Sequence, residues 1–359
     1  MFLFGGSRNS QVGVGIDIGT TAIKVAELTS GGKNSLELTN YALLEIAGHL
    51  DHFNNALQSS SLRPLDTDLV AYLRLIQEKV GLKTNHVRAS IPSFSSFTTL
   101  IEVPLASSAE TNKVLEFQVK NYIPLPITEV TLDWIKVGEK TYPDGSKKQQ
   151  IFLVSTPNEK IESYTKIFSQ AGFILDGIEL ENIAAARMVT NSTEAATLII
   201  DIGGRSTSFT VAERGVVKFT GQTDFSSNSL TQALATALNI SPRRADALKR
   251  ETMIVGGLGS HELSTILIPI IDVIISEATR VRTGFEQAFG TPITNSILIG
   301  SGAHMPGFEA YLTQHMNMPV VEVSELRNVV LRPEILAIGK ELASTLTVSA
   351  GLALKTVIH

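Results

Sequence analysis

The alternation of apolar and polar positions along the chain predicts strands and helices in turn. A continuous aliphatic run at residues 12–18 indicates a buried β-strand, and "AIKVAEL" just after it indicates a second one. Apolar residues spaced three and four apart over residues 65–80 predict a helix, which Gly81 would end. The sequence "YPDGS" predicts the turn of a β-hairpin. This order of elements is typical of an α/β protein.

One stretch of this pattern occurs twice. The segments "VGVGIDIGTTAIKVAELTSGGKNSLEL" and "ATLIIDIGGRSTSFTVAERGVVKF" both contain an aliphatic strand, Asp-Ile-Gly, a hydroxyl-rich turn and two further strands. The two acids of these motifs, Asp17 and Asp201, are far apart in the sequence. The repeat therefore indicates a duplicated fold rather than a short tandem repeat.

The length of 359 residues is too great for one compact core and suits two domains. We expect these to enclose a cleft and to carry one small α+β insert. The predicted parts are a flexible tail at 1–11, a first domain at 12–87 and 171–190 with 335–359 packing back on it, an insert at 88–170, and a second domain at 191–334.

The repeated turns have the chemistry of a phosphate site. Glycine lets the backbone approach a ligand closely, and Thr20 and Thr21 add hydroxyl donors. Asp17 and Asp201 would suit Mg²⁺ held through water, since Mg²⁺ uses few carboxylates. Lys24 could meet a phosphate as a point charge. A third glycine turn, "GSG" at residues 300–302, joins an apolar strand to a helix and is a further place where a nucleotide could approach.

The motifs in this order resemble the actin, Hsp70 and sugar-kinase superfamily. "GIDIGTTAIK" and "IIDIGGRSTS" are similar to its two phosphate motifs, and "ILIGSGAHMPGF" is similar to its adenosine motif. "ENIAAARM" and "VSAGLALK" are similar to its two connecting helices. The resemblance covers nearly the whole chain. It implies an actin-like, ribonuclease H-like duplicated fold with two domains around a nucleotide cleft.

Within that superfamily the chain resembles the PilM family of type IV pilus proteins and the division protein FtsA. The insert lies where both have an extra subdomain, of the kind called 1C in FtsA. "FQVKNYIPLPITEVTLDW", the ending "VSAGLALK" and the initial "FLFG" resemble PilM in particular. The resemblance implies a cytoplasmic protein that binds ATP and Mg²⁺ and captures the tail of a PilN-like inner-membrane protein. Pilus motor ATPases and a second copy of the chain are further candidate partners.

The resemblance also implies roles for single residues. The metal-side acids would be Asp17, Glu181 and Asp201. The phosphate and adenosine positions would be Gly19, Thr20, Thr21, Lys24, Gly203, Gly204, Ser206, Asp246, Lys249, Gly300, Ser301 and Gly302. One departure is Arg205, where many relatives have a small residue. A large cation there could pair with a phosphate or point to solvent, and it leaves ATP hydrolysis open.

Composition limits the other functions. The net charge of −5 argues against a nucleic-acid partner, and the lack of cysteine excludes disulfides and sulfur-ligated zinc. The most apolar long stretch, Leu263 to Ile275, contains Pro269 and Asp272 and is shorter than the ~20 residues of a membrane span. We therefore expect membrane contact only through a partner.

Three functions remain open at this point. An ATP-binding pilus adaptor with at most slow ATPase activity fits the motifs best. An FtsA-like filament former is an alternative, although the C-terminal segment does not look like an amphipathic membrane tail. A sugar or acetate kinase is another, but we recognise no second set of substrate-binding residues.

Overall fold

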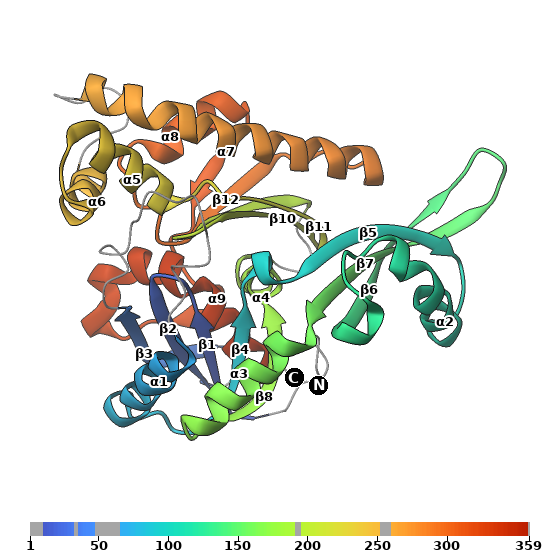
Figure 1. Ribbon diagram of the computed structural model, residues 1–359, viewed down its shortest axis with the longest axis horizontal. Helices are drawn as coiled ribbons and strands as arrows, with labels where there is room; N and C mark the ends of the chain where they lie inside the picture. The colour runs from blue at the N-terminus through green and yellow to red at the C-terminus, as the bar shows by residue number, and fades with distance from the viewer. Residues whose placement is uncertain (1–9, 32–34, 47–64, 191–194, 252–259, 358–359) are drawn as a thin grey trace.

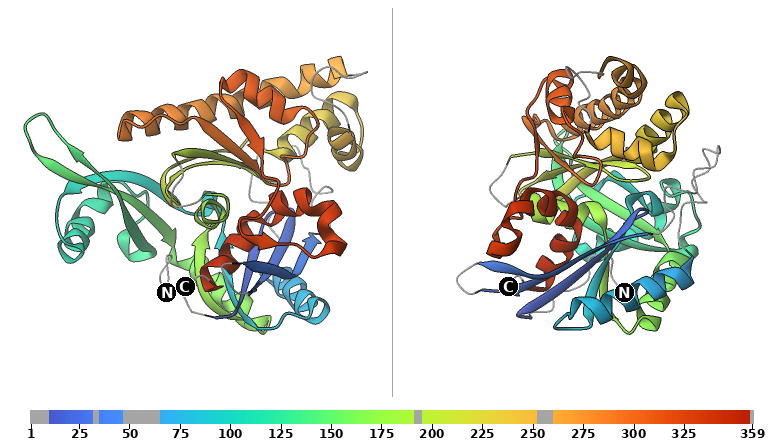
Figure 2. Two further views of the ribbon diagram at one scale, coloured as in Figure 1. Left: turned by 180° about the vertical axis from the view of Figure 1, so that it is seen from behind. Right: turned by 90° about the vertical axis from the view of Figure 1, so that its left-hand side faces the viewer.

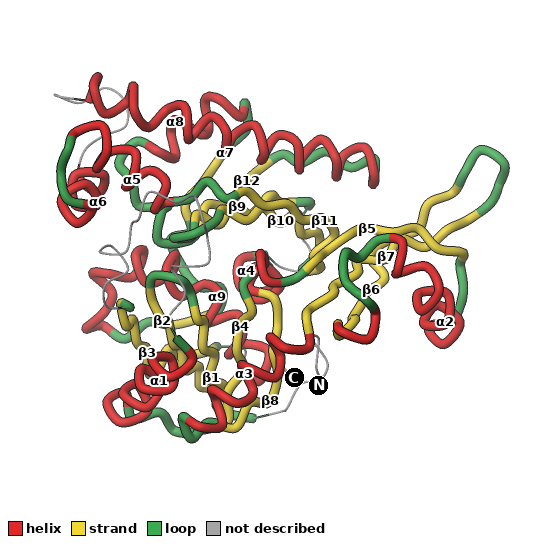
Figure 3. Tube along the Cα trace, in the orientation of Figure 1, coloured by secondary structure: helices red, strands yellow, loops and turns green. Residues whose placement is uncertain are grey.

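Two α/β domains lie one above the other, and a smaller subdomain projects from one side (Figure 1). The structure is a computed structural model that describes residues 10–31, 35–46, 65–190, 195–251 and 260–357. The predicted tail, residues 1–11, lies outside these residues except for its last two. Strands and helices follow each other along the chain in the predicted alternation (Figure 3).

The lower domain of Figure 1 is built on a six-stranded sheet with the order β14-β3-β2-β1-β4-β8. Its β1, β2 and β3 form an antiparallel meander, and β4 lies parallel to β1. Its strands are β1 (Val12–Ile18), β2 (Ala22–Ser30), β3 (Leu36–Glu45), β4 (His86–Ile91), β8 (Ile174–Leu180) and β14 (Val329–Val330). Its helices are α1 (Asp66–Val80), α3 (Asn158–Gln170), α4 (Glu181–Val189) and α9 (Gly339–Val357).

The alternation of side chains along β1 decides which helices cover each face of this sheet. Val14 and Ile16 belong to a buried cluster that includes residues of α1 and α3. Gly15 faces α9, and a Cβ built on it would lie only 1.9 Å from the Ser349 carbonyl oxygen. The glycine therefore lets α9 pack directly on the backbone of β1, at the centre of the domain.

The upper domain of Figure 1 repeats the same plan. Its sheet has the order β11-β10-β9-β12-β13, with an antiparallel meander followed by a parallel strand, so the predicted duplication is confirmed. The strands are β9 (Thr197–Ile202), β10 (Thr207–Glu213), β11 (Val216–Thr223), β12 (Asn295–Ile299) and β13 (Val320–Glu322). The helices are α5 (Ser227–Leu238), α6 (Pro242–Glu251), α7 (Ser260–Phe289) and α8 (Phe308–Met316).

The projecting subdomain is a three-stranded antiparallel sheet, β5-β7-β6, that carries one α-helix. Figure 2 shows its long hairpin reaching away from the two domains. The predicted turn "YPDGS" joins the two strands of this hairpin. The elements are β5 (Phe97–Pro104), α2 (Ser108–Gln118), β6 (Val130–Thr141) and β7 (Lys147–Pro157).

This sheet spans residues 97–157, a shorter segment than the predicted insert at 88–170. The difference arises because β4 is hydrogen-bonded to β1 and β8 and so belongs to the first domain. In the same way α3 packs against α1 and β8. Near the C-terminus, β14 pairs with β3, so the predicted second domain at 191–334 also gives one short strand to the first sheet.

One stretch of the described residues, Pro333–Val357, is long and apolar enough to cross a membrane. Its most apolar window has a mean hydropathy of 1.3, and 67% of that window is buried inside the protein. Packing of α9 against β1, β2 and α4 accounts for this apolar character. The stretch singled out in the sequence, Leu263 to Ile275, lies within α7.

Candidate functional site

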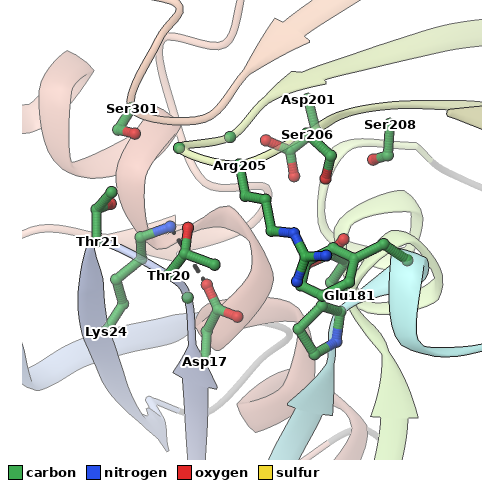
Figure 4. A pocket seen from close by; sticks show the side chains of 15 residues that line it. Asp17, Thr20, Thr21, Lys24, Glu181, Asp201, Arg205, Ser206, Ser208 and Ser301 are labelled. Atoms are coloured by element: carbon green, nitrogen blue, oxygen red, sulfur yellow. Dashed lines mark hydrogen bonds and ion pairs between the residues drawn. The ribbon is translucent and has the colours of Figure 1, made fainter. Parts of the chain in front are cut away.

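A pocket lies between the two domains, where the turns of their leading hairpins meet (Figure 4). Its cavity measures about 50 Å³. Turns that are far apart in the sequence thus share one hollow. The predicted residues that line it are Asp17, Gly19, Thr20, Thr21, Lys24, Glu181, Asp201, Gly203, Gly204, Ser206 and Ser301.

The lower wall is the turn between β1 and β2. The Gly19 N–H donates to the Ala22 carbonyl at 3.0 Å and closes this turn. The antiparallel register places Lys24 opposite Asp17, and its Nζ lies 3.3 Å from Asp17 Oδ2. The Ser90 hydroxyl, from the neighbouring strand β4, donates to Asp17 Oδ1 at 2.6 Å. Asp17 is therefore buried and held by two partners.

The upper wall is the equivalent turn between β9 and β10. The Gly203 N–H donates to the Ser206 carbonyl at 3.0 Å, which repeats the hydrogen bond of the first turn at the same spacing from the aspartate. The register opposite Asp201 is filled by Ser208, where the first hairpin has Lys24. The two turns thus have the same backbone hydrogen bond, but the residue opposite the aspartate is charged only in the first hairpin.

The two turns touch across the pocket. A Cβ built on Gly204 would lie 2.4 Å from Thr21 Cγ2 and 3.1 Å from Thr20 Oγ1. A larger residue at Gly204 would require the side chains of Thr20 and Thr21 to shift. The glycine of the second motif therefore permits the close approach of the two domains.

Glu181 enters the pocket from the first turn of α4. Its Oε1 accepts a hydrogen bond from the Ser93 N–H at 2.9 Å. Burial raises the pKa of Glu181 to about 8, and the nearby Asp201 and Asp17 carboxylates add to the rise. Burial also raises the pKa of Asp201 to about 6, although Lys24 opposes this shift.

The neighbouring carboxylates also shift the pKa of Lys24. Burial by itself would lower the pKa of Lys24, but the Asp17 and Asp201 carboxylates outweigh burial and raise it. The ammonium group therefore stays protonated in the pocket.

The third glycine turn lies against the end of β9. Gly300 has a φ of +92°, and a Cβ there would lie 2.3 Å from Asp201 Oδ1. The Gly302 N–H donates to the Ile202 carbonyl at 2.9 Å. Ser301, between them, lines the pocket, whereas the two glycines do not.

Asp246 and Lys249 lie on α6 and do not line this pocket. Lys249 Nζ is 2.7 Å from Asp246 Oδ1 and donates to the Thr231 hydroxyl of α5 at 2.8 Å. Burial alone would raise the pKa of Asp246, but Lys249 and Arg250 hold it at about 2. In this structure the pair joins α5 to α6, and its predicted contact with a nucleotide stays a prediction.

Four lining residues were not among the predicted site residues: Pro92, Phe94, Arg205 and Ser208. The sequence marks Arg205 only as a departure from the motif. Ser208 could have been predicted from the repeat, because it lies opposite Asp201 just as Lys24 lies opposite Asp17 in the first hairpin. Pro92 and Phe94 precede β5, and only the folded chain brings them to the cleft.

The pocket fits a magnesium-bound phosphate better than a bare metal ion. Three carboxylates share it, and the raised pKa values of two of them show negative charge that a divalent cation would relieve. Among the described residues, no group of three or more His, Asp or Glu could hold a metal directly. Mg²⁺ usually keeps several waters and binds substrate phosphates, which suits such a site.

Duplicated α/β domains around a cleft, with matching Asp-Ile-Gly turns on its facing walls, define the actin-like class of proteins. Solved structures have the same fold. A chain of a PilM-PilN type IV pilus biogenesis complex has a TM-score of 0.79 and 19% identity, covering 97% of this chain and 99% of that one. MreB5 of Spiroplasma citri bound to AMPPNP has a TM-score of 0.53 and 13% identity, covering 94% and 96%.

The chain belongs to the type IV pilus assembly protein PilM family, whose family model matches residues 15–357. It is also similar to cell division protein FtsA of Enterococcus faecalis, with 23% identity over 362 residues, 85% of this chain and 79% of that protein. The predicted resemblance to the actin-like superfamily and to PilM is thereby confirmed.

Proposed function

We propose that this chain is a cytoplasmic, ATP-binding adaptor of the type IV pilus assembly complex. It holds MgATP between its domains and captures the N-terminal tail of a PilN-like inner-membrane protein. The observation that carries the proposal is that both Asp-Ile-Gly turns line one pocket. Glycine N–H groups and threonine and serine hydroxyls would bind the phosphates, and Asp17, Glu181 and Asp201 would hold Mg²⁺ through water.

A second cavity supports the capture of a peptide. It measures about 300 Å³ and lies where the insert meets both domains. Most of its lining is apolar, with two cations at its edge. Its residues are Trp134, Ile135, Phe152, Ile183, Arg187, Gly215, Val216, Val217 and Lys355. A cavity of this size and character suits the apolar side chains of a docked segment.

The strand beside this cavity suits an extended ligand. β6 carries Trp134 and Ile135, and among the described residues it pairs with β7 alone. An edge strand can accept a further strand through its backbone, which is a common way to bind an extended tail. The tail of a membrane protein would reach such an edge without unfolding either partner.

The proposed adaptor would hydrolyse ATP slowly, if it hydrolyses ATP. A general base must be unprotonated at the working pH. The pKa of about 8 keeps Glu181 largely protonated at neutral pH when no cation is bound. The cleft is therefore better suited to holding ATP than to turning it over quickly.

The decisive experiment follows both ligands in one set of proteins. We expect Asp201→Ala to weaken binding of a fluorescent ATP analogue with Mg²⁺ by about tenfold or more, since a charged contact is lost. Capture of a synthetic N-terminal peptide of a PilN-like protein should persist in this variant without nucleotide. Glu116→Ala, an exposed carboxylate on α2 outside both cavities, is the matched control. Wild-type protein that captures no peptide with or without MgATP contradicts the adaptor function.

The similarity to FtsA favours one second candidate, an actin-like filament former. It predicts that MgATP increases light scattering and sedimentation of the wild-type protein in proportion to its concentration. If the protein stays monomeric at high concentration with MgATP, the filament-forming function is contradicted and the adaptor function stands.

A further inference from the structure

A buried carboxylate lies next to the third glycine turn. Glu322 is the last residue of β13, and its side chain is 9% exposed. Its Oε1 lies 2.6 Å from His304 Nδ1, and its Oε2 lies 3.0 Å from Lys340 Nζ. Burial by itself would raise the pKa of Glu322, but His304 and Lys340 outweigh burial and lower it. Each oxygen of the carboxylate therefore has a nitrogen partner of its own.

The two partners of Glu322 come from different domains. His304 lies two residues beyond the third glycine turn, on the chain between β12 and α8 of the second domain. Lys340 is the second residue of α9, which packs on β1 and β2 of the first domain. Glu322 thus links the third glycine turn to a helix of the other domain.

The same helix also contacts the start of this turn. The Gly300 N–H donates to the Ser344 carbonyl of α9 at 3.5 Å, and the Ser344 hydroxyl donates to the Gly300 carbonyl at 3.4 Å. Both hydrogen bonds are long and therefore weak. The link through Glu322 lies at the other end of the turn and has shorter contacts, so we expect it to fix the turn against α9.

The residue between these two links lines the pocket. Ser301 belongs to its lining, whereas Glu322, His304 and Lys340 do not. The sequence predicts that this turn receives the adenosine of a nucleotide and that the two Asp-Ile-Gly turns receive its phosphates. A network outside the pocket can therefore order the nucleoside end of the site without touching the ligand.

We propose that Glu322 is a positioning residue that holds the third glycine turn against α9 in the conformation that receives the nucleoside. The inference rests on the proposed function, in which the cleft binds ATP. A turn that is already ordered loses less conformational freedom when a ligand binds, so the nucleotide binds more tightly. Lys340 of the first domain thereby contributes to binding at a turn of the second domain.

Two measurements test this role in the full chain. Calorimetry gives the dissociation constant for ATP with Mg²⁺. Hydrogen exchange without nucleotide, followed by mass spectrometry, reports on the Gly302 and Ala303 N–H groups, which are hydrogen-bonded at the turn. We expect Glu322→Gln, which keeps the shape but removes the charge, to weaken ATP binding by about three- to tenfold. Exchange in the third glycine turn should accelerate by a similar factor, and exchange in the two Asp-Ile-Gly turns should not change.

Lys340→Met tests the link to α9. It should weaken ATP binding by about two- to threefold, because the lysine is 60% exposed and its ion pair is partly screened. The double variant with Glu322→Gln should bind ATP no more weakly than Glu322→Gln alone, because the lysine acts through the carboxylate. Glu334→Gln is the matched control, since this exposed carboxylate lies on the chain between β13 and α9. It should bind ATP as the wild type does.

The inference is wrong if the wild type binds ATP and Glu322→Gln binds it as tightly, and the proposed function then stands. Faster exchange in all three turns would also overturn the inference, because Glu322 then supports the whole fold. Weaker ATP binding with unchanged exchange in the third turn, or additive losses in the double variant, would equally contradict the positioning role. A wild-type protein that binds no ATP overturns the proposed function together with the inference.

Discussion

Acidic side chains are crowded together in the cleft, where burial and their mutual repulsion disfavour the charged forms of Glu181 and Asp201. Burial raises the pKa values of Glu181 and Asp201, and the Asp17 and Asp201 carboxylates outweigh burial to raise the pKa of Lys24. For the two acids the folded state binds protons that the unfolded chain has already released. Their contribution to the free energy of unfolding is therefore unfavourable above their ordinary pKa values.

This sign gives a prediction for pH dependence. The ordinary pKa of Glu181 is 4.5 and its folded value is about 8, so its effect on stability grows as pH rises through that interval. We expect Glu181→Gln to raise Tm at pH 8 by a few degrees, about the effect of 1 kcal/mol in a protein of this size. At pH 5, where the native side chain is already neutral, Tm should hardly change.

Differential scanning calorimetry at the two pH values provides the measurement. Glu116→Gln, an exposed carboxylate on α2, is the control and should change Tm at neither pH. An equal gain at pH 5 and pH 8 from Glu181→Gln would show that charge is not its cause.

Among the helices and strands, α9 packs directly on β1 at the centre of the first domain. This contact depends on Gly15, whose position leaves no room for a methyl group beside the Ser349 carbonyl. Both partners are rigid backbone, so neither can turn aside as a flexible side chain would.

We therefore expect Gly15→Ala to destabilise the fold by about 1–3 kcal/mol or more, as overpacked cores do. The matched control is Gly339→Ala at the start of α9. There the nearest atom is the end of a side chain, Leu331 Cδ1 at 3.0 Å. Urea denaturation gives both free energies of unfolding, and equal midpoints for the two variants would contradict this account.

The hairpins and amphipathic helices were predictable at this scale, and their assembly was less so. The turn "YPDGS" and the helix ending at Gly81 are local signals, so the structure has both. The partners of β4 and α3 could not be predicted from the sequence, because strand pairing and helix packing join residues far apart in the chain. The three-stranded sheet is consequently shorter than the segment predicted as the insert, because β4 and α3 pack on the first domain.

In the whole molecule, the cleft is too narrow for the ligand that its chemistry suits. Its cavity of about 50 Å³ could take a few waters, whereas sites for ligands of nucleotide size are usually above ~300 Å³. Gly204 lies against Thr21 and Arg205 lies over Phe94, so the two walls are in contact. We therefore expect the two domains to move apart when a nucleotide enters.

A disulfide away from the phosphate turns tests this movement. The hydroxyls of Thr98 on β5 and Thr220 on β11 lie 2.8 Å apart and join the insert to the second domain. The chain has no cysteine of its own, so Thr98→Cys with Thr220→Cys gives one defined cross-link. We expect oxidation to slow association of a fluorescent ATP analogue on the order of tenfold or more, and reduction to restore it.

Stopped-flow fluorescence measures the association rate, and each single cysteine variant controls for the substitution itself. Equal rates for the oxidised and reduced double variant, with the disulfide verified by mass spectrometry, would mean that the domains need not separate at this edge.

The duplicated turns were predictable from the sequence, since Asp-Ile-Gly followed by hydroxyls specifies a local bend and its chemistry in both copies. It also indicated the actin-like class and most of the residues that line the cleft. Folding in three dimensions was needed to bring Phe94 under Arg205, to place Lys249 of α6 beside Thr231 of α5, and to set the small size of the cavity. Bends depend on neighbours in the chain, whereas contacts across a cleft depend on how whole domains pack.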